Sequence, residues 1–178
     1  MRAFYGSDPL SHPQRLSRLL LNGIQEMYWS ESRLSDELSD FSEVASDPAL
    51  KKVLTNRVNE TRGHIRRLNA IFEMTGVRAR RRKSRGMASL LRDVALVVET
   101  SAEGSPVSDI ALVTEMQRIA HFEMACYEGL TAMAALLPDE EIHRQLDLTL
   151  QEEQASDAAL SELALTVLNP RALSAGED

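Results

Sequence analysis

Apolar residues recur every three or four positions along most of this chain, and no other feature of the sequence constrains the fold as strongly. The first such stripe is made up of Leu16, Leu20, Ile24, Met27, Leu34, Leu38 and Phe41. Residues three and four apart lie on the same face of an α-helix. Leu and Ala are frequent while Val and Ile are scarce, a composition that favours helix over strand. The pattern therefore predicts long amphipathic helices.

Proline, glycine and capping residues divide the chain into five helical segments. Proline suits the first turn of a helix, Ser and Asp suit the position before it, and glycine suits the position after its end. The expected helices run from Ser11–Pro13 to Ser46, from Pro48 to Gly76, from about Met87 to Thr100, from Pro106 to Pro138, and from Asp139 to Asn169.

The order of these segments predicts an all-α domain. The two outer pairs of helices are each joined by a short link, which favours two antiparallel hairpins, and the short third helix lies in the long crossover between them. We expect a four-helix bundle over residues 11–169, with flexible tails at residues 1–10 and 170–178.

Composition excludes several functions. The net charge of −7 argues against a general nucleic-acid binder, because affinity for phosphates comes largely from positive charge. No stretch approaches the roughly 20 apolar residues that span a bilayer, and the N-terminus lacks the pattern of a secretion signal. Cys126 is the single cysteine, so no internal disulfide can form. We therefore expect a cytoplasmic protein.

Acidic residues interrupt the apolar stripes. Glu31 lies between Met27 and Leu34 on one stripe, and Glu123 and Glu153 interrupt two other stripes in the same way. Glu60 lies at the edge of the inward face of the second helix. His64 follows Glu60 by four residues, and Asp157 follows Glu153 by four. Positions four apart share a helix face, so each pair can converge on one point.

The same arrangement occurs in both hairpins. Glu31 and Glu123, Glu60 and Glu153, and His64 and Asp157 are each 92 or 93 positions apart. Buried carboxylates are costly unless they are paired or bind a metal. Di-iron and di-manganese bundles use a similar set of inward carboxylates and histidines. The sequence therefore predicts a dinuclear Fe or Mn site formed by Glu31, Glu60, His64, Glu123, Glu153 and Asp157.

A second interpretation needs no metal. The inward acids would pair with arginines such as Arg62 and Arg118, and the protein would be a non-catalytic helical protein. A third possibility is a partner-binding protein that uses the basic segment RARRRKSR at residues 78–85. That segment has no interleaved aromatic residue for base stacking, so a solvated loop is the simpler interpretation.

Four segments resemble the YciE/YciF family of ferritin-like bacterial stress proteins. They are MYWSESRL (27–34), NETRGHIRRLNAIFEMTGV (59–77), SPVSDIALVTEMQRIAHFEMACYEGL (105–130) and LQEEQASDAALSELA (150–164). Glu31, Glu60, Glu123, Glu153 and Asp157 fall where family members carry acids, and His64 falls where the family varies. The chain departs from the family at Ala120 and Leu96, where acids are common.

The resemblance implies a ferritin-like bundle, a homodimer and a link to stress responses. It also implies a dinuclear metal site whose reaction is not settled. Such a site would make the protein an oxidoreductase of the peroxidase, catalase or ferroxidase type, acting on peroxide, dioxygen or ferrous ion. The alternative is a non-catalytic dimeric stress protein with a vestigial metal site.

Overall fold

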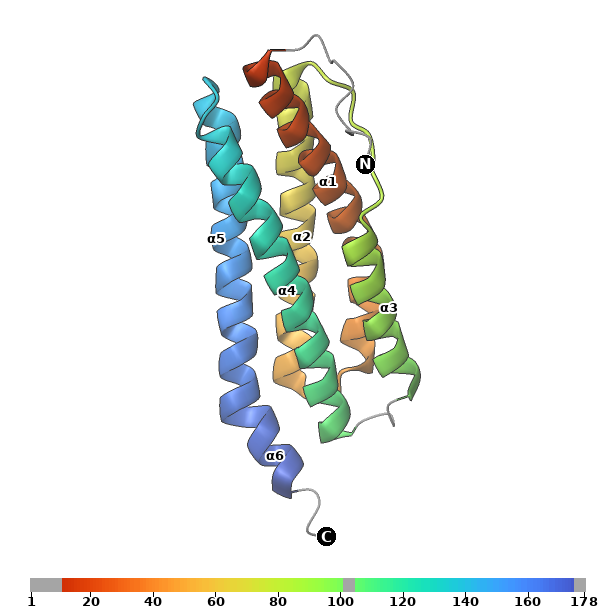
Figure 1. Cartoon of the computed structure of the whole chain (residues 1–178). Helices are drawn as coiled ribbons and strands as arrows, with labels where there is room; N and C mark the ends of the chain where they lie inside the picture. Colours follow the sequence, from red (N-terminus) through yellow and green to blue (C-terminus); the bar gives the residue numbers. More distant parts are fainter. Residues whose placement is uncertain (1–10, 101–104, 175–178) are drawn as a thin grey trace, which may run out of the picture.

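The structure is a computed structural model that describes residues 11–100 and 105–174, and all regular structure within those ranges is helical. The elements are α1 (His12–Val44), α2 (Pro48–Thr75), α3 (Arg85–Thr100), α4 (Pro106–Ala134), α5 (Glu140–Leu163), the π-helical turn η1 (Ala164–Leu168) and α6 (Asn169–Ser174). The four long helices α1, α2, α4 and α5 form one bundle (Figure 1). This architecture confirms the predicted fold class.

The helix ends carry the caps that the sequence predicted. Ser11 forms a capping box with Gln14 at the start of α1, and Asp47 accepts hydrogen bonds from two backbone N–H groups in the first turn of α2. Gly76 ends α2 with a φ of 66°, a left-handed conformation that glycine adopts without strain. Ser105 caps α4 in the same way as Asp47 caps α2.

The buried positions of the long helices follow alternating steps of four and three residues. In α1 they include Leu20, Ile24, Met27, Glu31, Leu34, Leu38 and Phe41. In α5 they are Ile142, Leu146, Thr149, Glu153, Ser156, Leu160 and Leu163. This repeat is typical of helices that pack at about 20° to one another in a left-handed bundle. A polar residue on such a track is therefore held in the core by the register of its helix.

The chain connects the bundle as two antiparallel hairpins. Helices α1 and α2 form the first and α4 and α5 the second, and these two pairs make the most extensive contacts in the molecule. The long crossover runs from the end of α2 back along the bundle and includes α3, which packs on α4 and α1 (Figure 1). The predicted short helix in the crossover is therefore present, beginning two residues before Met87.

One buried carboxylate fastens the hairpins together at the end where α4 begins. Asp109 accepts hydrogen bonds from Ser46 N at 2.8 Å, from Ser46 Oγ at 2.6 Å and from Asp47 N at 2.9 Å. The turn between α1 and α2 is thus tied to the first turn of α4. The backbone N–H groups of Ser46 and Asp47 have no partner within a helix, and the Asp109 carboxylate satisfies them.

The apolar core consists of two clusters, one in each half of the bundle. One includes Leu34, Leu38, Leu54, Met116 and Leu160, and the other includes Leu20, Ile24, Leu68, Leu130 and Leu146. The boundary falls between Met27 and Leu34 on α1, at Glu31, which is itself fully buried. A buried polar layer therefore separates the two apolar clusters.

The prediction that the last helix ends at Asn169-Pro170 was wrong. The wide turn η1 follows α5, and the chain remains helical through α6 to Ser174, within the segment expected to be a tail. Because the helix restarts after η1, Pro170 falls in the first turn of α6, where its missing N–H costs little. Arg171 of α6 contacts the Asp47 carboxylate at 2.8 Å, which holds this helix against the start of α2.

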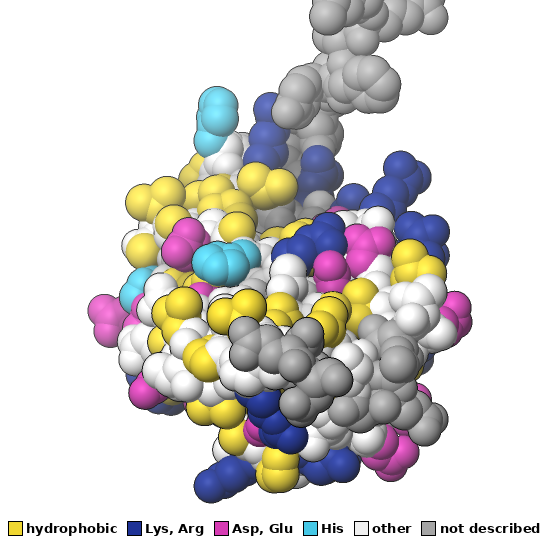
Figure 2. Space-filling model, turned by 90° about the horizontal axis from the view of Figure 1, so that it is seen from below, with side chains coloured by type: hydrophobic (Ala, Val, Ile, Leu, Met, Phe, Trp, Pro, Cys, Tyr) yellow, Lys and Arg dark blue, Asp and Glu magenta, His cyan; other side chains and the backbone are white. Residues whose placement is uncertain are grey.

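The end of the bundle near α6 exposes several apolar side chains among charged ones. Leu165, Leu173 and Val107 are among the most exposed large apolar residues, and Figure 2 views the molecule from this end. No helix in the described ranges is long and apolar enough to cross a membrane.

Candidate metal centre

Three glutamates from three helices meet in the polar layer. Glu31 of α1, Glu123 of α4 and Glu153 of α5 each have an exposed fraction of 0%. Each occupies a core position in the four-and-three repeat of its helix, so the packing of the bundle brings them together. The prediction that these three residues point inward is thus met in full.

Helix α2 adds His64 to this layer, and together with Glu31 and Glu153 it forms a group that could hold a metal ion. One carboxylate oxygen from each glutamate and a ring nitrogen of the histidine all lie within 4.8 Å of one another. The Nδ1 atom of His64 is 3.2 Å from Glu31 Oε1 and 3.2 Å from Glu153 Oε1. All three residues are buried. Carboxylate and imidazole ligands of this kind suit Fe and Mn.

Both ring nitrogens of His64 face carboxylates. While Nδ1 faces the two glutamates of the layer, Nε2 lies 3.0 Å from Glu152 Oε2 at the edge of the bundle. Burial alone would lower the pKa of His64, but Glu31 and Glu153 outweigh it and raise the pKa to about 11. In the absence of a metal ion, His64 is therefore a protonated imidazolium at neutral pH.

Arg57 supplies a second cation to the same layer. Its side chain is only 1% exposed, and Nη2 donates to Glu123 Oε2 at 2.7 Å and to Glu153 Oε2 at 2.8 Å. Its Nη1 donates to Ser156 Oγ at 2.8 Å. The guanidinium thus bridges the acids of α4 and α5 from its position on α2.

Burial and neighbouring charges shift the pKa values of the acids in this layer. Burial raises the pKa of Glu123, and Glu153 and Glu31 raise it further, so this carboxyl holds its proton well above its ordinary range. Burial also acts to raise the pKa of Glu153, but Arg57 and His64 more than offset it and hold the pKa below its ordinary value. Without a metal, the layer is stabilised by two cations, Arg57 and His64.

The acids retain unused ligand atoms. Glu31 Oε2 and Glu123 Oε1 are buried and have no hydrogen-bond partner among the described residues, and Glu153 Oε1 faces only His64 Nδ1, at 3.2 Å. Buried carboxylate oxygens usually find a donor or a metal. The donor set therefore fits one metal ion at Glu31, His64 and Glu153. It does not fit a second ion between Glu123 and Glu153, because Arg57 already occupies that position.

Tyr127 orients one of the candidate ligands. Its hydroxyl donates to Glu31 Oε1 at 2.7 Å, and its ring meets the His64 ring edge-on at 6.4 Å. Burial, followed by the charge of Glu31, raises the pKa of Tyr127 well above its ordinary value, so the phenol remains a donor. Tyr28, by contrast, packs edge-on against Phe72.

Three predicted ligands lie outside the group of three, and one of them, Glu123, pairs with Arg57. Glu60 of α2 is half-buried, and burial raises its pKa. Asp157 lies one turn beyond Glu153 on α5, where its Oδ2 is 3.5 Å from Nε2 of the exposed His121 and its Oδ1 is buried with no hydrogen-bond partner among the described residues. The prediction that these residues bind metal is not tested by any contact in the structure.

The expected partners of the acids were wrong, and the actual one was missed. Arg62 is exposed, and Arg118 pairs with Glu115 and Asp93 on the surface. Arg57 performs this role instead. A signal for it exists in the sequence, because Arg57 lies seven residues before His64 and continues the same four-and-three track of α2.

The basic segment at residues 78–85 is partly engaged by the fold. Arg82 contacts Glu26 Oε1 at 3.0 Å, and its backbone N–H donates to the carbonyl of Gln25. Arg81 lies over the ring of Tyr28, 5.6 Å from its centroid. These contacts attach the segment to α1.

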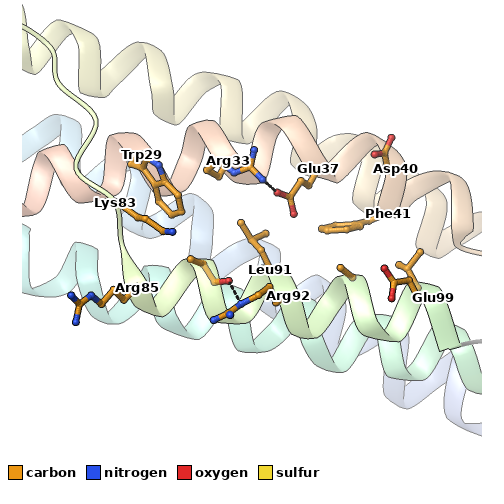
Figure 3. Close-up of a pocket in the computed structure, with 13 residues that line it drawn as sticks. Trp29, Arg33, Glu37, Asp40, Phe41, Lys83, Arg85, Leu91, Arg92 and Glu99 are labelled. Carbon is orange, nitrogen blue, oxygen red and sulfur yellow. Dashed lines mark hydrogen bonds and ion pairs between the residues drawn. The ribbon is translucent and has the colours of Figure 1, made fainter.

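A groove of about 800 Å³ lies between α1 and α3, apart from the buried acids. Figure 3 shows Trp29, Lys83 and Arg85 at one end, with Asp40 and Glu99 at the other. None of the three candidate ligands lines this groove.

The arrangement of helices and the buried carboxylate–histidine layer define a ferritin-like four-helix bundle with a candidate metal centre. The chain belongs to the family described as Domain of unknown function (DUF892), whose model matches residues 15–173. It is 29% identical over 150 residues to protein YciF of Escherichia coli (strain K12), covering 84% of this chain and 90% of YciF. These findings confirm the resemblance that the sequence motifs indicated.

Solved structures of two relatives share the fold. The crystal structure of the E. coli stress protein YciF has a TM-score of 0.81 at 27% identity, covering 86% of this chain and 97% of YciF. YcfI from Rhodopseudomonas palustris, a proposed structural protein, has a TM-score of 0.78 at 28% identity, covering 89% of this chain and 98% of YcfI.

Proposed function

We propose that this protein is a cytoplasmic stress-response protein that binds one Fe or Mn ion at Glu31, His64 and Glu153. The single observation that carries the proposal is the convergence of three buried ligand atoms within 4.8 Å. The role in stress is inferred from the similarity to the E. coli stress protein YciF. The dinuclear site predicted from the sequence is reduced here to one ion, because a guanidinium lies between two of the acids.

Each side chain has a distinct role in this proposal. Glu31 and Glu153 provide negative charge, His64 provides a nitrogen ligand, and Tyr127 holds Glu31 through its hydroxyl. Glu152 contacts the outer nitrogen of His64 and orients the ring, as carboxylates commonly do for metal-binding histidines. A bound Fe or Mn ion would supply redox chemistry toward peroxide, dioxygen or ferrous ion.

Metal content tests the proposal. Purified chain is stripped with chelator, loaded anaerobically with Fe(II) or Mn(II), and measured by elemental analysis after desalting. We expect about one ion per chain in the wild type and at least a tenfold loss of affinity in Glu31→Gln and His64→Ala, since the first removes the negative charge of a ligand and the second removes the nitrogen ligand.

Two control variants sharpen this experiment. Glu128→Gln changes an exposed acid on α4 and should leave metal binding unchanged. Asp157→Asn removes a predicted ligand that lies outside the group of three, and we expect it to bind as the wild type does. Metal retained by His64→Ala, or no metal in the wild type after loading, would contradict the proposal.

The second candidate function is a non-catalytic structural role. The observation that favours it is the metal-free charge balance that Arg57 and His64 bring to the buried acids. YcfI, with the same fold, has been proposed to be structural. This alternative predicts that chelator leaves thermal stability unchanged and that added Fe(II) or Mn(II) does not raise it. The metal-binding proposal predicts a rise in Tm with metal concentration.

We also propose that two copies associate through the groove between α1 and α3. Its basic end at Lys83 and Arg85 and its acidic end at Asp40 and Glu99 lie on either side of a middle part that contains Leu91 and the charged side chains of Arg33, Glu37 and Arg92 (Figure 3). A two-fold axis across the groove would bring the basic end of one copy onto the acidic end of the other. Such self-complementarity is what a two-fold interface requires.

A further inference from the structure

We propose that Arg57 is a resident cation that replaces the second metal ion of a dinuclear centre, so that this protein binds one metal ion and not two. The inference rests on the proposed metal binding at Glu31, His64 and Glu153, and it assigns the nuclearity of that centre. The observation behind it is the position of the buried Arg57 side chain, which its ion pairs with Glu123 and Glu153 explain without a metal ion.

The first argument is geometric. One nitrogen of Arg57, Nη2, lies within 2.8 Å of oxygens from both Glu123 and Glu153, which come from neighbouring helices. A metal ion that bridged these two acids would have to occupy the same space. The other nitrogen, Nη1, is held by Ser156, so the guanidinium is anchored on two sides and does not merely lean into the layer.

The second argument is that the positive charge of Arg57 is permanent. An arginine stays charged at every physiological pH, unlike a lysine or a histidine, and it cannot lose a proton to become a metal ligand. The chain holds Arg57 on the core track of α2, with an exposed fraction of 1%. Its stem cannot swing to solvent without opening the packing between α2 and α5.

The third argument is formal charge. Three buried carboxylates, at Glu31, Glu123 and Glu153, carry three negative charges when all are ionised. Arg57 and one divalent ion bound through neutral His64 balance them. A second divalent ion beside Arg57 would leave a net charge of +2 in a dry interior, where unbalanced charge is strongly unfavourable. One divalent metal ion together with Arg57 therefore leaves this layer with no net charge.

Manganese loading of three proteins tests the inference. Wild type, Arg57→Gln and Arg57→Lys are stripped, loaded with excess Mn(II) and desalted, and bound Mn is measured by elemental analysis and by low-temperature EPR. We expect about one ion and an isolated six-line signal in the wild type. Arg57→Gln should approach two ions with an exchange-coupled signal, and Arg57→Lys, which keeps the charge, should remain near one.

Thermal unfolding in chelator and in Mn(II) distinguishes a change in metal binding from a simple folding defect. Arg57→Gln should melt below the wild type in chelator and recover more than the wild type when Mn(II) is added, because the ion replaces the lost cation. If this variant does not fold even with Mn(II), the wild-type stoichiometry and EPR signal decide: one isolated ion supports the inference, and a coupled pair overturns it.

The outcomes separate this inference from the proposed function. A single isolated ion in a folded Arg57→Gln would overturn the role of Arg57 and leave the proposed function intact. Two coupled ions in the wild type would overturn the role of Arg57 and the one-ion stoichiometry, and leave metal binding at Glu31, His64 and Glu153 intact. No Mn in the wild type but binding by Arg57→Gln would contradict the proposed function and support the exclusion by Arg57. No Mn in any folded protein would overturn both.

Discussion

A buried ion is expensive, and the central layer of this bundle contains several whose charges are arranged to satisfy one another. Arg57 bridges Glu123 and Glu153, while His64 lies between Glu31 and Glu153. Removing one member of such a network leaves its partner buried and unpaired, which costs about 3–5 kcal/mol. Substitutions in this layer therefore report on both stability and metal binding, and conservative ones are the most informative.

Tyr127→Phe is the mildest test of the layer. It deletes the hydroxyl that donates to Glu31 Oε1 at 2.7 Å and keeps the ring in the core. A hydrogen bond to a charged group contributes about 1.5–3 kcal/mol, so the free energy of unfolding in chelator should fall by about that amount. Urea unfolding measures it. Tyr28→Phe, a half-buried tyrosine packed on Phe72, is the matched control and should change stability by less than about 0.5 kcal/mol.

The protonation of His64 predicts how stability depends on pH without metal. Its surroundings include Glu31 on α1, Tyr127 on α4, and Glu152 and Glu153 on α5. They raise its folded pKa to about 11, above its ordinary value of 6.5. A raised folded pKa contributes stability that is complete below pH 6.5 and is lost as pH rises toward 11.

We therefore expect Tm in chelator to fall steadily between pH 7 and pH 10. Burial, Glu153 and Glu31 also raise the pKa of Glu123, and a raised folded pKa likewise contributes stability that is lost as pH rises through it. In His64→Gln the fall should be shallower, since the imidazolium no longer contributes. A wild-type Tm that rises over this range, or a slope unchanged by His64→Gln, would contradict the assignment of a protonated His64.

At the scale of the helices, substitutions at two glycines allow the effect of packing on stability to be measured apart from the effect of helix propensity. A Cβ added at Gly23 of α1 would come 2.5 Å from Leu130 Cδ2 of α4, whereas a Cβ at Gly129 of α4 would meet no atom within 4 Å. Gly23 thus permits a close approach of α1 to α4 at the edge of the second apolar cluster. Gly129 lies in a helix interior with no packing reason to be glycine.

Substituting each glycine by alanine should have opposite effects. Gly129→Ala should stabilise the protein by about 0.5–1 kcal/mol, the usual gain for alanine over glycine inside a helix. Gly23→Ala gains the same propensity but overpacks the core, which costs about 1–3 kcal/mol, so its net effect should be destabilising. Chemical denaturation of both variants tests this, and equal stabilisation by the two would show that the Leu130 side chain or the helices can shift without cost.

At the scale of the whole molecule, the proposed dimer depends on charges at the two ends of one groove. Reversing the acidic end with Asp40→Lys and Glu99→Lys should weaken association at least tenfold, because like charges would then meet across the two-fold axis. Sedimentation velocity at low ionic strength measures the change. Adding Lys83→Glu and Arg85→Glu to the same chain should restore association.

The control and the contrary result for the dimer are equally direct. Glu128→Lys and Glu162→Lys place the same charges on α4 and α5, away from the groove, and should leave the sedimentation coefficient unchanged. A wild type that sediments as a monomer at high concentration would contradict the proposal. So would a dimer that survives the reversal at Asp40 and Glu99 without change.

Local chemistry in the chain was sufficient to predict the architecture. Ser11, Asp47, Gly76 and Ser105 cap helices where their side chains or backbone freedom act over a few residues, and the apolar stripes specify which face of each helix is buried. The prediction failed at Asn169-Pro170, because the turn η1 shifts the hydrogen-bond register and lets a proline enter a new helix. Such a shift depends on packing against α4, which no local pattern encodes.

Part of the candidate site was likewise predictable from local sequence, and part was not. That Glu31, Glu123, Glu153 and His64 face the core follows from helical periodicity alone, since the position of a residue on a helix decides its face. Which cation meets which acid was decided only by the tertiary structure, because partners 66 to 99 residues apart come together through the packing of separate helices. Periodicity could show that acids were buried, but only the assembled bundle showed that Arg57 lies between two of them.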